Sequence, residues 1–216
     1  MKEVLVTGGS GQVGGALLAL PPQPSLRFVG LGRDSLDLLK PETFAGVLTS
    51  RPWAAIINAA AYTAVDKAES EVEEAWRINA LAPACLARQA ALAGIPLVHI
   101  STDYVFSGAS ARPYAEDDPV APLGVYGASK EGGEQGVRTA GGRAVIVRTS
   151  WVVSPWRANF LKTMLSLGAE RDVLRVVADQ QGAPTSASDL ALALATIARA
   201  LANDPAAPTG TFHFSN

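Results

Sequence analysis

The chain has 216 residues, of which 48% are hydrophobic and 18% charged, and its formal net charge is -2. It is long enough to bury a large core as one domain, with or without a small appendage. The charge balance provides no basic field for nucleic acid or an anionic membrane. One cysteine, Cys85, and two histidines exclude a disulfide framework and give no zinc-like cluster. With no membrane-length apolar run and no signal-peptide layout, we expect a soluble globular enzyme or binding domain of the reducing cytoplasm.

The first predicted unit is a strand at 3–7, a glycine turn at 8–14 and a helix at 16–20. The glycines fit two registers, Gly8-x-x-Gly11-x-x-Gly14 and Gly9-x-Gly11-x-x-Gly14. Both let the backbone approach a pyrophosphate at a helix N-terminus, although glycine-rich turns also serve as plain connections. The position directly after the first strand favours dinucleotide binding.

A second strand is predicted at 26–31, after a proline-rich break at 21–24, and it ends in Gly32-Arg33-Asp34. In a doubly wound fold this strand end meets the adenosine ribose, where an acidic residue suits NAD and an arginine suits the 2′-phosphate of NADP. Arg33 and Asp34 leave that choice open. Both also fit a simple solvated strand end.

A helix at about 41–50 and a third strand at 54–58 lead to the small residues Ala59–Ala61. Small residues after a parallel strand let a cofactor lie against the backbone, although alanines also serve packing. A long helical stretch is predicted from residue 65 to about residue 93. Within this stretch, Asn79 has two equally favoured interpretations. It could fix a loop or a water near the cofactor, or it could be an ordinary polar residue on the helix.

The fourth predicted strand, 96–102, brings Ser101, Thr102, Asp103 and Tyr104 to its carboxyl end. In open α/β sheets the ligand lies outside this edge, so we expect these side chains near the substrate. The Thr102 hydroxyl could hydrogen-bond a reacting oxygen and help polarise it. His99, inside the apolar run, is predicted to be a core residue rather than a catalyst.

After a loop at 107–124, the next predicted helix carries Tyr126 and Lys130. Residues four apart share a helix face, so both polar tips could point into one cleft. A tyrosine phenol is protonated at neutral pH, so it has a proton to donate. A neighbouring cation favours the phenolate and so makes the phenol a better acid. The pair could therefore protonate a carbonyl oxygen during reduction. The alternative is an aromatic residue and a lysine on a solvated helix face.

The remaining elements are less informative about chemistry. A strand is expected at 143–148, and Trp151 after it could stack on a sugar or nucleotide ring or anchor packing. The other predicted elements are a helix at 159–165, a strand at 173–178, a helix at 187–202 and the start of a strand at 211–216.

Several motifs carry a family resemblance. The glycine turn, Ser101–Phe106 and Tyr126–Lys130 resemble the extended branch of the short-chain dehydrogenase/reductase superfamily. Within it, three further segments resemble the dTDP-4-dehydrorhamnose reductases, namely Asn58–Glu69, Arg148–Trp151 and Asp179–Thr185. The resemblance implies a Rossmann-like doubly wound parallel sheet at 1–150, and at 151–216 a small substrate-binding portion that is expected to be incomplete at its C-terminus.

By this resemblance, Thr102, Tyr126 and Lys130 would be catalytic. Tyr126 would protonate the sugar C4 oxygen, Lys130 would hold the cofactor ribose and lower the phenol pKa, and Thr102 would bind the carbonyl oxygen. The implied NADPH or NADH would also lie along Gly8, Gly11, Gln12, Val13, Gly14, Arg33, Asp37, Leu38, Ala60, Ala61, Tyr62, Thr63 and Asn79. Val65, Asp103, Tyr104 and Trp151, together with Thr102, would face the dTDP-sugar.

The implied activity is reduction of dTDP-4-dehydro-L-rhamnose to dTDP-L-rhamnose. Two alternatives stay open: a non-catalytic cofactor-binding subunit resembling the regulatory subunit of methionine adenosyltransferase, and a related nucleotide-sugar reductase or epimerase. Some family members bind magnesium at a homodimer interface, but no residue of this sequence can be assigned to either the metal or the dimer.

Overall fold

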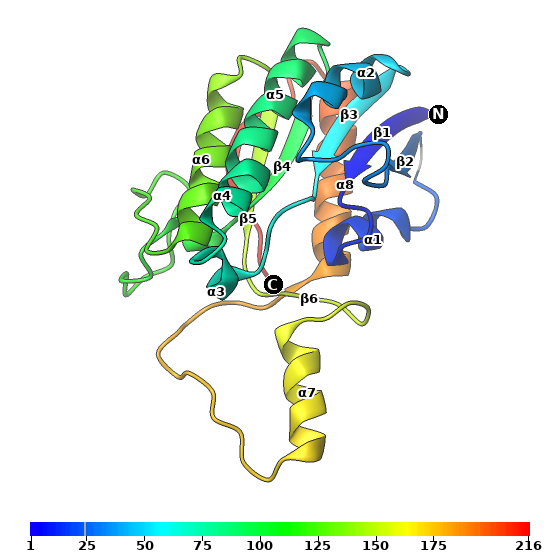
Figure 1. The fold of residues 1–216 in the computed structure, drawn as a ribbon. Coiled ribbons are helices and arrows are strands. Elements are labelled where there is room, and N and C mark those ends of the chain that lie inside the picture. Colours follow the sequence, from blue (N-terminus) through cyan, green and yellow to red (C-terminus); the bar gives the residue numbers. More distant parts are fainter. Residues whose placement is uncertain (24) are drawn as a thin grey trace.

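The computed structural model describes residues 1–23 and 25–216, so Pro24 of the proline-rich break lies outside the described residues. Six strands form one parallel sheet in the order β2-β1-β3-β4-β5-β8 (Figure 1). They are β1 (Lys2–Thr7), β2 (Leu26–Gly30), β3 (Trp53–Asn58), β4 (Leu97–Thr102), β5 (Ala144–Thr149) and β8 (Gly210–His213). The strand order reverses between β1 and β3, which is where open α/β sheets bind ligands. The Rossmann-like fold predicted from the sequence is confirmed.

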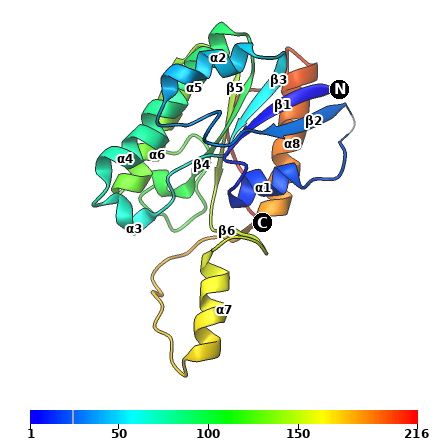
Figure 2. The same cartoon turned by 45° about the vertical axis from the view of Figure 1, so that its right-hand side comes forward.

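Helices cover both faces of the sheet (Figure 2). On one face lie α1 (Gln12–Leu18) and α8 (Ala187–Asn203); the other carries η1 (Pro41–Thr43), α2 (Phe44–Thr49), α5 (Ala82–Leu92) and α6 (Val125–Thr139). The side chains of β1 alternate between the two cores: Val4 and Val6 pack with α1 and α8, and Leu5 packs with α2 and α5. Period-2 alternation between two apolar layers explains why Val4, Leu5 and Val6 are all apolar.

The predicted helix over 65–93 is broken in the structure. It consists of α3 (Val65–Ala68), α4 (Val72–Trp76), the π-helical turn η2 (Arg77–Leu81) and α5. Glu71, which precedes α4, has φ -113° and ψ 45°, outside the helical region. The short turn η3 (Asp103–Val105) follows β4.

A smaller unit extends below the sheet in Figure 1. It contains α7 (Phe160–Glu170) and the two-stranded pair of β6 (Val152–Val153) and β7 (Thr185–Ser186). The strand predicted at 173–178 is wrong, because these residues form no strand. Val173 and Val177 are 76% and 71% exposed, so the β-rich run has no partner strand or packing layer to make it a strand.

The packing divides the chain differently from the expected boundary at residue 150. Both α8 and β8 lie beyond that residue, yet β8 pairs with β5 in the main sheet. Leu190 and Leu194 of α8 are fully buried in the core that α8 shares with α1. The segment outside the sheet layers is therefore about 151–186, and the chain returns to the sheet after it.

Candidate active site

The glycine turn after β1 lies tightly against the segment that follows β3. Gly8 has φ +66°, and a Cβ atom at this position would lie 2.7 Å from the backbone nitrogen of Ala60. A Cβ atom at Gly14 would lie 2.2 Å from the carbonyl oxygen of Gly8. Side chains are excluded at both positions, so an elongated ligand can approach this backbone closely.

A cavity of about 850 Å³ opens along this turn and the carboxyl ends of β1, β2, β3 and β4. Most of the predicted site residues line it: Gly8, Gly11, Gln12, Val13, Arg33, Asp37, Leu38, Ala60, Ala61, Thr63, Val65, Thr102, Asp103, Tyr104, Tyr126, Lys130 and Trp151. Gly14, Tyr62 and Asn79 are not among the lining residues. The cavity falls within the range of small-molecule and cofactor sites, and its glycine cradle fits a dinucleotide.

Asn79 is fully buried and ties the cofactor side of the cavity to α6. Its Oδ1 accepts from the backbone N–H of Tyr62 at 2.9 Å, and its Nδ2 donates to the Tyr62 carbonyl at 3.0 Å and to Ser129 Oγ at 3.1 Å. The π-helical turn that contains Asn79 is a feature frequent at functional sites. Of the two roles left open by the sequence, the contacts correspond to fixing a loop.

The Tyr62 side chain is engaged outside the cavity. Its hydroxyl donates to Glu71 Oε2 at 2.7 Å, and Glu71 also pairs with Lys67. The bond to the Glu71 carboxylate raises the pKa of Tyr62 to about 12. That Tyr62 lies along the cofactor stays a prediction; in this structure its hydroxyl is occupied by Glu71.

Thr102, Tyr126 and Lys130 meet where β4 ends and α6 begins. Thr102 Oγ1 donates to Asp103 Oδ1 at 3.1 Å and accepts from the backbone N–H of Tyr104 at 3.2 Å. The Lys130 ammonium is buried and donates to the Ile100 carbonyl at 2.7 Å. The rings of Tyr104 and Tyr126 contact edge to face, with centroids 5.5 Å apart. All three predicted catalytic side chains therefore lie at one end of the cavity.

Burial governs the protonation of this group. It raises the pKa of Tyr126 to about 12, with the Thr102 hydroxyl acting in the opposite direction. It lowers the pKa of Lys130 to about 8, against the attraction of Glu134. The expectation that Lys130 lowers the phenol pKa is not met in this structure, because desolvation of the phenolate dominates. Tyr126 is protonated, and Lys130 mainly charged, at neutral pH.

A buried ion pair that was not predicted from the sequence joins α6 to β5. Arg148 on β5 donates from Nε to Glu134 Oε1 at 2.9 Å and from Nη2 to Glu134 Oε2 at 2.8 Å, and Arg138 also bonds this carboxylate. Glu134 is four residues after Lys130, so it lies on the same helix face. That spacing, together with an arginine inside an apolar strand, was the available signal.

Trp151 adopts a left-handed backbone conformation with φ 44°. Its carbonyl accepts from the backbone N–H of Thr185 at 3.2 Å, and its ring lies against Gly182, where an added Cβ atom would be 2.8 Å from the ring. A non-glycine residue in this region stores strain that the surrounding structure must offset. The indole is nevertheless 42% exposed and lines the cavity, where it can meet a ligand.

His99 is confirmed as a core residue, fully buried with its Nδ1 3.0 Å from Asn58 Nδ2. Within residues 1–23 and 25–216, no group of three or more histidine, cysteine or acidic side chains is arranged to hold a metal ion. Over the same residues, no helix is long and apolar enough to cross a membrane.

Comparisons with known proteins agree with this geometry. A curated relative from Sinorhizobium fredii, named dTDP-4-dehydrorhamnose reductase, is 46% identical over 99% of this chain and 72% of its own length. A Streptomyces antibioticus protein named "Probable dTDP-4,6-dihydroxy-2-methyloxan-3-one 4-ketoreductase" is 40% identical over 90% of this chain and 66% of its own.

Among solved structures, the dTDP-4-dehydrorhamnose reductase of Bacillus anthracis in complex with NADP superposes with a TM-score of 0.92 at 38% identity, covering 100% of this chain and 75% of that one. The family described as the RmlD substrate binding domain matches residues 1–216. The chain belongs to this family.

Proposed function

We propose that this chain reduces the C4 keto group of dTDP-4-dehydro-L-rhamnose to give dTDP-L-rhamnose, with NADPH or NADH as the reductant. The observation that carries the proposal is the meeting of Thr102, Tyr126 and Lys130 in one cavity with the glycine turn. The set combines a proton donor, a hydroxyl and a cation beside a dinucleotide cradle, as carbonyl reduction requires. The names of the similar proteins support this choice of substrate.

When bound, NADPH or NADH would supply the hydride that reduces C4. Tyr126 supplies the proton: its phenol is protonated at neutral pH, since burial raises its pKa to about 12, and it donates to the sugar C4 oxygen as charge develops there. Thr102 Oγ1 hydrogen-bonds the same oxygen and orients it. General-acid help of this kind contributes about 10²- to 10⁴-fold to the rate.

Lys130 acts through its charge and its position. Its Nζ is fixed by the Ile100 carbonyl, which leaves other N–H groups to bind the cofactor ribose. With substrate and cofactor bound, the charge of Lys130, one helical turn from Tyr126, would favour the phenolate that remains when the proton has moved to the sugar. Val65, Asp103, Tyr104 and Trp151 are proposed to face the sugar, and 151–186 is proposed as the part of the chain that shapes the substrate side.

The test is oxidation of NADPH and NADH by the purified chain with dTDP-4-dehydro-L-rhamnose, with Tyr126→Phe alongside. We expect the variant to lose about 10²- to 10⁴-fold in kcat and to keep its affinity for cofactor. Tyr114→Phe is the matched control, because Tyr114 stacks on Phe106 away from the cavity. Tight cofactor binding without turnover would contradict the proposal and favour the regulatory-subunit alternative.

The related ketoreductase from Streptomyces antibioticus supports a second candidate of the same chemistry, reduction of another dTDP-4-keto sugar. The catalytic set would be the same and only the pocket would differ. Measuring kcat/KM for two such sugars separates the candidates.

A homodimer stays a prediction of the family resemblance, and sedimentation with and without magnesium tests it.

A further inference from the structure

The side chain of Gln12, the first residue of α1 after the glycine turn, is engaged with a distant part of the chain. Its Nε2 donates to the Val152 carbonyl at 3.2 Å, and its Oε1 accepts from Ser154 Oγ at 2.8 Å and from Asn159 Nδ2 at 3.0 Å. A side-chain amide can form about four hydrogen bonds. Three of them go to the segment 152–159, so the Gln12 amide has one fixed orientation.

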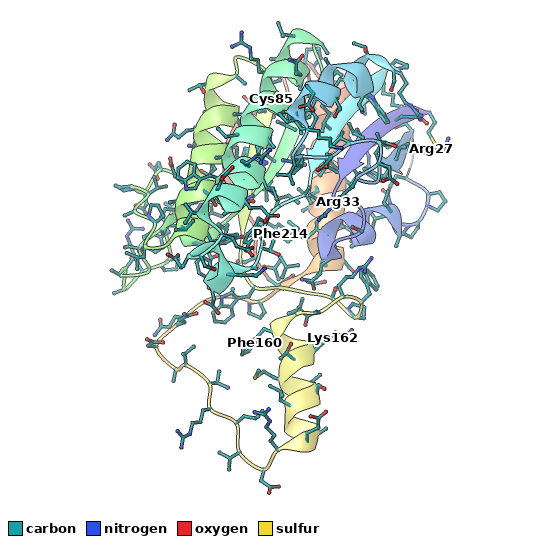
Figure 3. All side chains as sticks on the ribbon, in the orientation of Figure 1. Arg27, Arg33, Cys85, Phe160, Lys162 and Phe214 are labelled. Carbon is teal, nitrogen blue, oxygen red and sulfur yellow. The ribbon has the colours of Figure 1, made fainter. Side chains whose placement is uncertain are left out.

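Asn159 extends this connection to α7. It is the N-cap of that helix, and its Oδ1 accepts from the backbone N–H of Lys162 at 3.1 Å. Its Nδ2 donates to the Ser154 carbonyl at 2.9 Å as well as to Gln12. Figure 3 shows Phe160 and Lys162 at the end of α7 that faces the sheet. One side chain therefore links the first turn of α1 to the cap of α7.

Little else fixes α7 to the sheet within the described structure. None of its residues is buried. Beside Gln12, Trp156 provides a second contact, since a Cβ atom added at Gly15 would lie 3.4 Å from its indole nitrogen. Gln12, Asn159 and Phe160 line the cavity together with the catalytic residues. The placement of the substrate side therefore depends on the first turn of α1.

We infer that Gln12 is a positioning residue, which couples the cofactor turn to segment 152–159 and α7 and so sets the substrate side of the cavity. Its side chain is used for this link, and the backbone of the glycine turn is left to meet the cofactor phosphates. The inference rests on the proposed function for the identity of the two ligands. The resemblance implied that Gln12 contacts the cofactor. The inference keeps this contact for the backbone of Gln12 and assigns the side chain to the link with segment 152–159.

The test compares wild type with Gln12→Ala in the full chain. The NADPH dissociation constant is measured by fluorescence, and amide hydrogen exchange of residues 152–163 is measured with and without NADPH. In wild type, NADPH should slow exchange of this segment. In Gln12→Ala the dissociation constant should be essentially unchanged, the slowing should be lost, and the KM for the sugar should rise about 5- to 30-fold with a smaller change in kcat.

Asn159→Asp is the matched variant. A carboxylate keeps the acceptor that caps α7 and removes the N–H group that reaches Gln12. It should reproduce the KM and exchange changes, and the double variant should add little to either single change. Gln135→Ala, an exposed glutamine on α6, is the control and should behave as wild type.

Two results would overturn the inference: absence of an NADPH effect on exchange of 152–163 in wild type, or a weaker NADPH affinity in Gln12→Ala with the exchange response intact. Failure of the proposed function is distinguishable, because it would abolish sugar turnover in wild type and leave the binding and exchange measurements unaffected.

Discussion

Lys130 shows how a single catalytic side chain affects stability. Burial lowers its pKa to about 8 from the ordinary lysine value of 10.5, and one pKa unit corresponds to about 1.4 kcal/mol. The charged ammonium therefore destabilises the folded state by about 3 kcal/mol at neutral pH. The cost is fully present below pH 8 and disappears as the pH rises towards 10.5, because the unfolded chain then also loses this proton.

We expect Lys130→Met to abolish activity and to stabilise the fold at pH 7 by about 1 kcal/mol, since loss of the bond to the Ile100 carbonyl offsets part of the gain. The advantage over wild type should shrink between pH 8 and pH 10.5. Urea unfolding across this range measures it, with the exposed Lys40→Met as control. A stability difference that stays constant over the pH range would contradict the assigned cause.

Arg33 is the residue from which we predict a preference for NADPH over NADH. It lines the cavity after β2, whereas Asp34 does not, and Figure 3 shows its position near α1. A guanidinium suits the 2′-phosphate of NADPH. We expect Arg33→Ala to weaken NADPH about tenfold or more, as loss of a charge-assisted bond of about 1.5–3 kcal/mol requires, and to leave NADH unchanged. Titration of both nucleotides checks this, with Asp34→Ala as control; equal weakening of both would refute it.

At the scale of elements, α6 is held close to the π-helical turn η2. A Cβ atom added at Gly133 would lie 2.1 Å from the Asn79 carbonyl oxygen, so a larger residue must push the helix that carries Tyr126 and Lys130 away. We expect Gly133→Ala to cost about 1–3 kcal/mol of unfolding free energy and to lower kcat. Thermal unfolding and turnover measure the two effects.

Gly168→Ala on α7 is the matched control. Its nearest neighbour would be 3.9 Å away, so the substitution meets no clash and should stabilise the helix by about 0.5–1 kcal/mol. If both substitutions behaved alike, the close approach of α6 to η2 would not explain the cost at Gly133.

The sequence predicted elements well where local pattern and packing agree. The apolar runs of β1, β3 and β4 are buried between two helical layers, and each was expected within a residue or two. The run 173–178 has the same β-rich composition but no neighbouring strand, and composition alone does not report that. The hydrogen bonds of Gln12 join residues about 140 positions apart in the chain, so local patterns could not give them. For the Glu134–Arg148 pair, the sequence offers an arginine inside an apolar strand and a glutamate four residues after Lys130, but it does not show that these two side chains meet.

At the scale of the whole molecule, the six-stranded sheet is completed by β8, which follows the peripheral segment 151–186. The segment 171–184 is largely exposed, and Arg175 within it is a site for trypsin. We expect limited proteolysis to cut here first, and the two pieces to stay together on gel filtration, since β8 pairs with β5 and α8 is buried in the core. Separation of the fragments under native conditions would contradict this account of the packing.

The position of β8 also has a consequence for how the chain acquires its structure. During synthesis β5 leaves the ribosome well before β8, and until then its outer edge has unpaired N–H and C=O groups beside the apolar residues Val145 and Val147. Such edges are templates for pairing with other chains. Folding should therefore become committed only when α8 and β8 dock, and destabilising substitutions in α8 should lower the yield of soluble protein more than equally destabilising ones in α7.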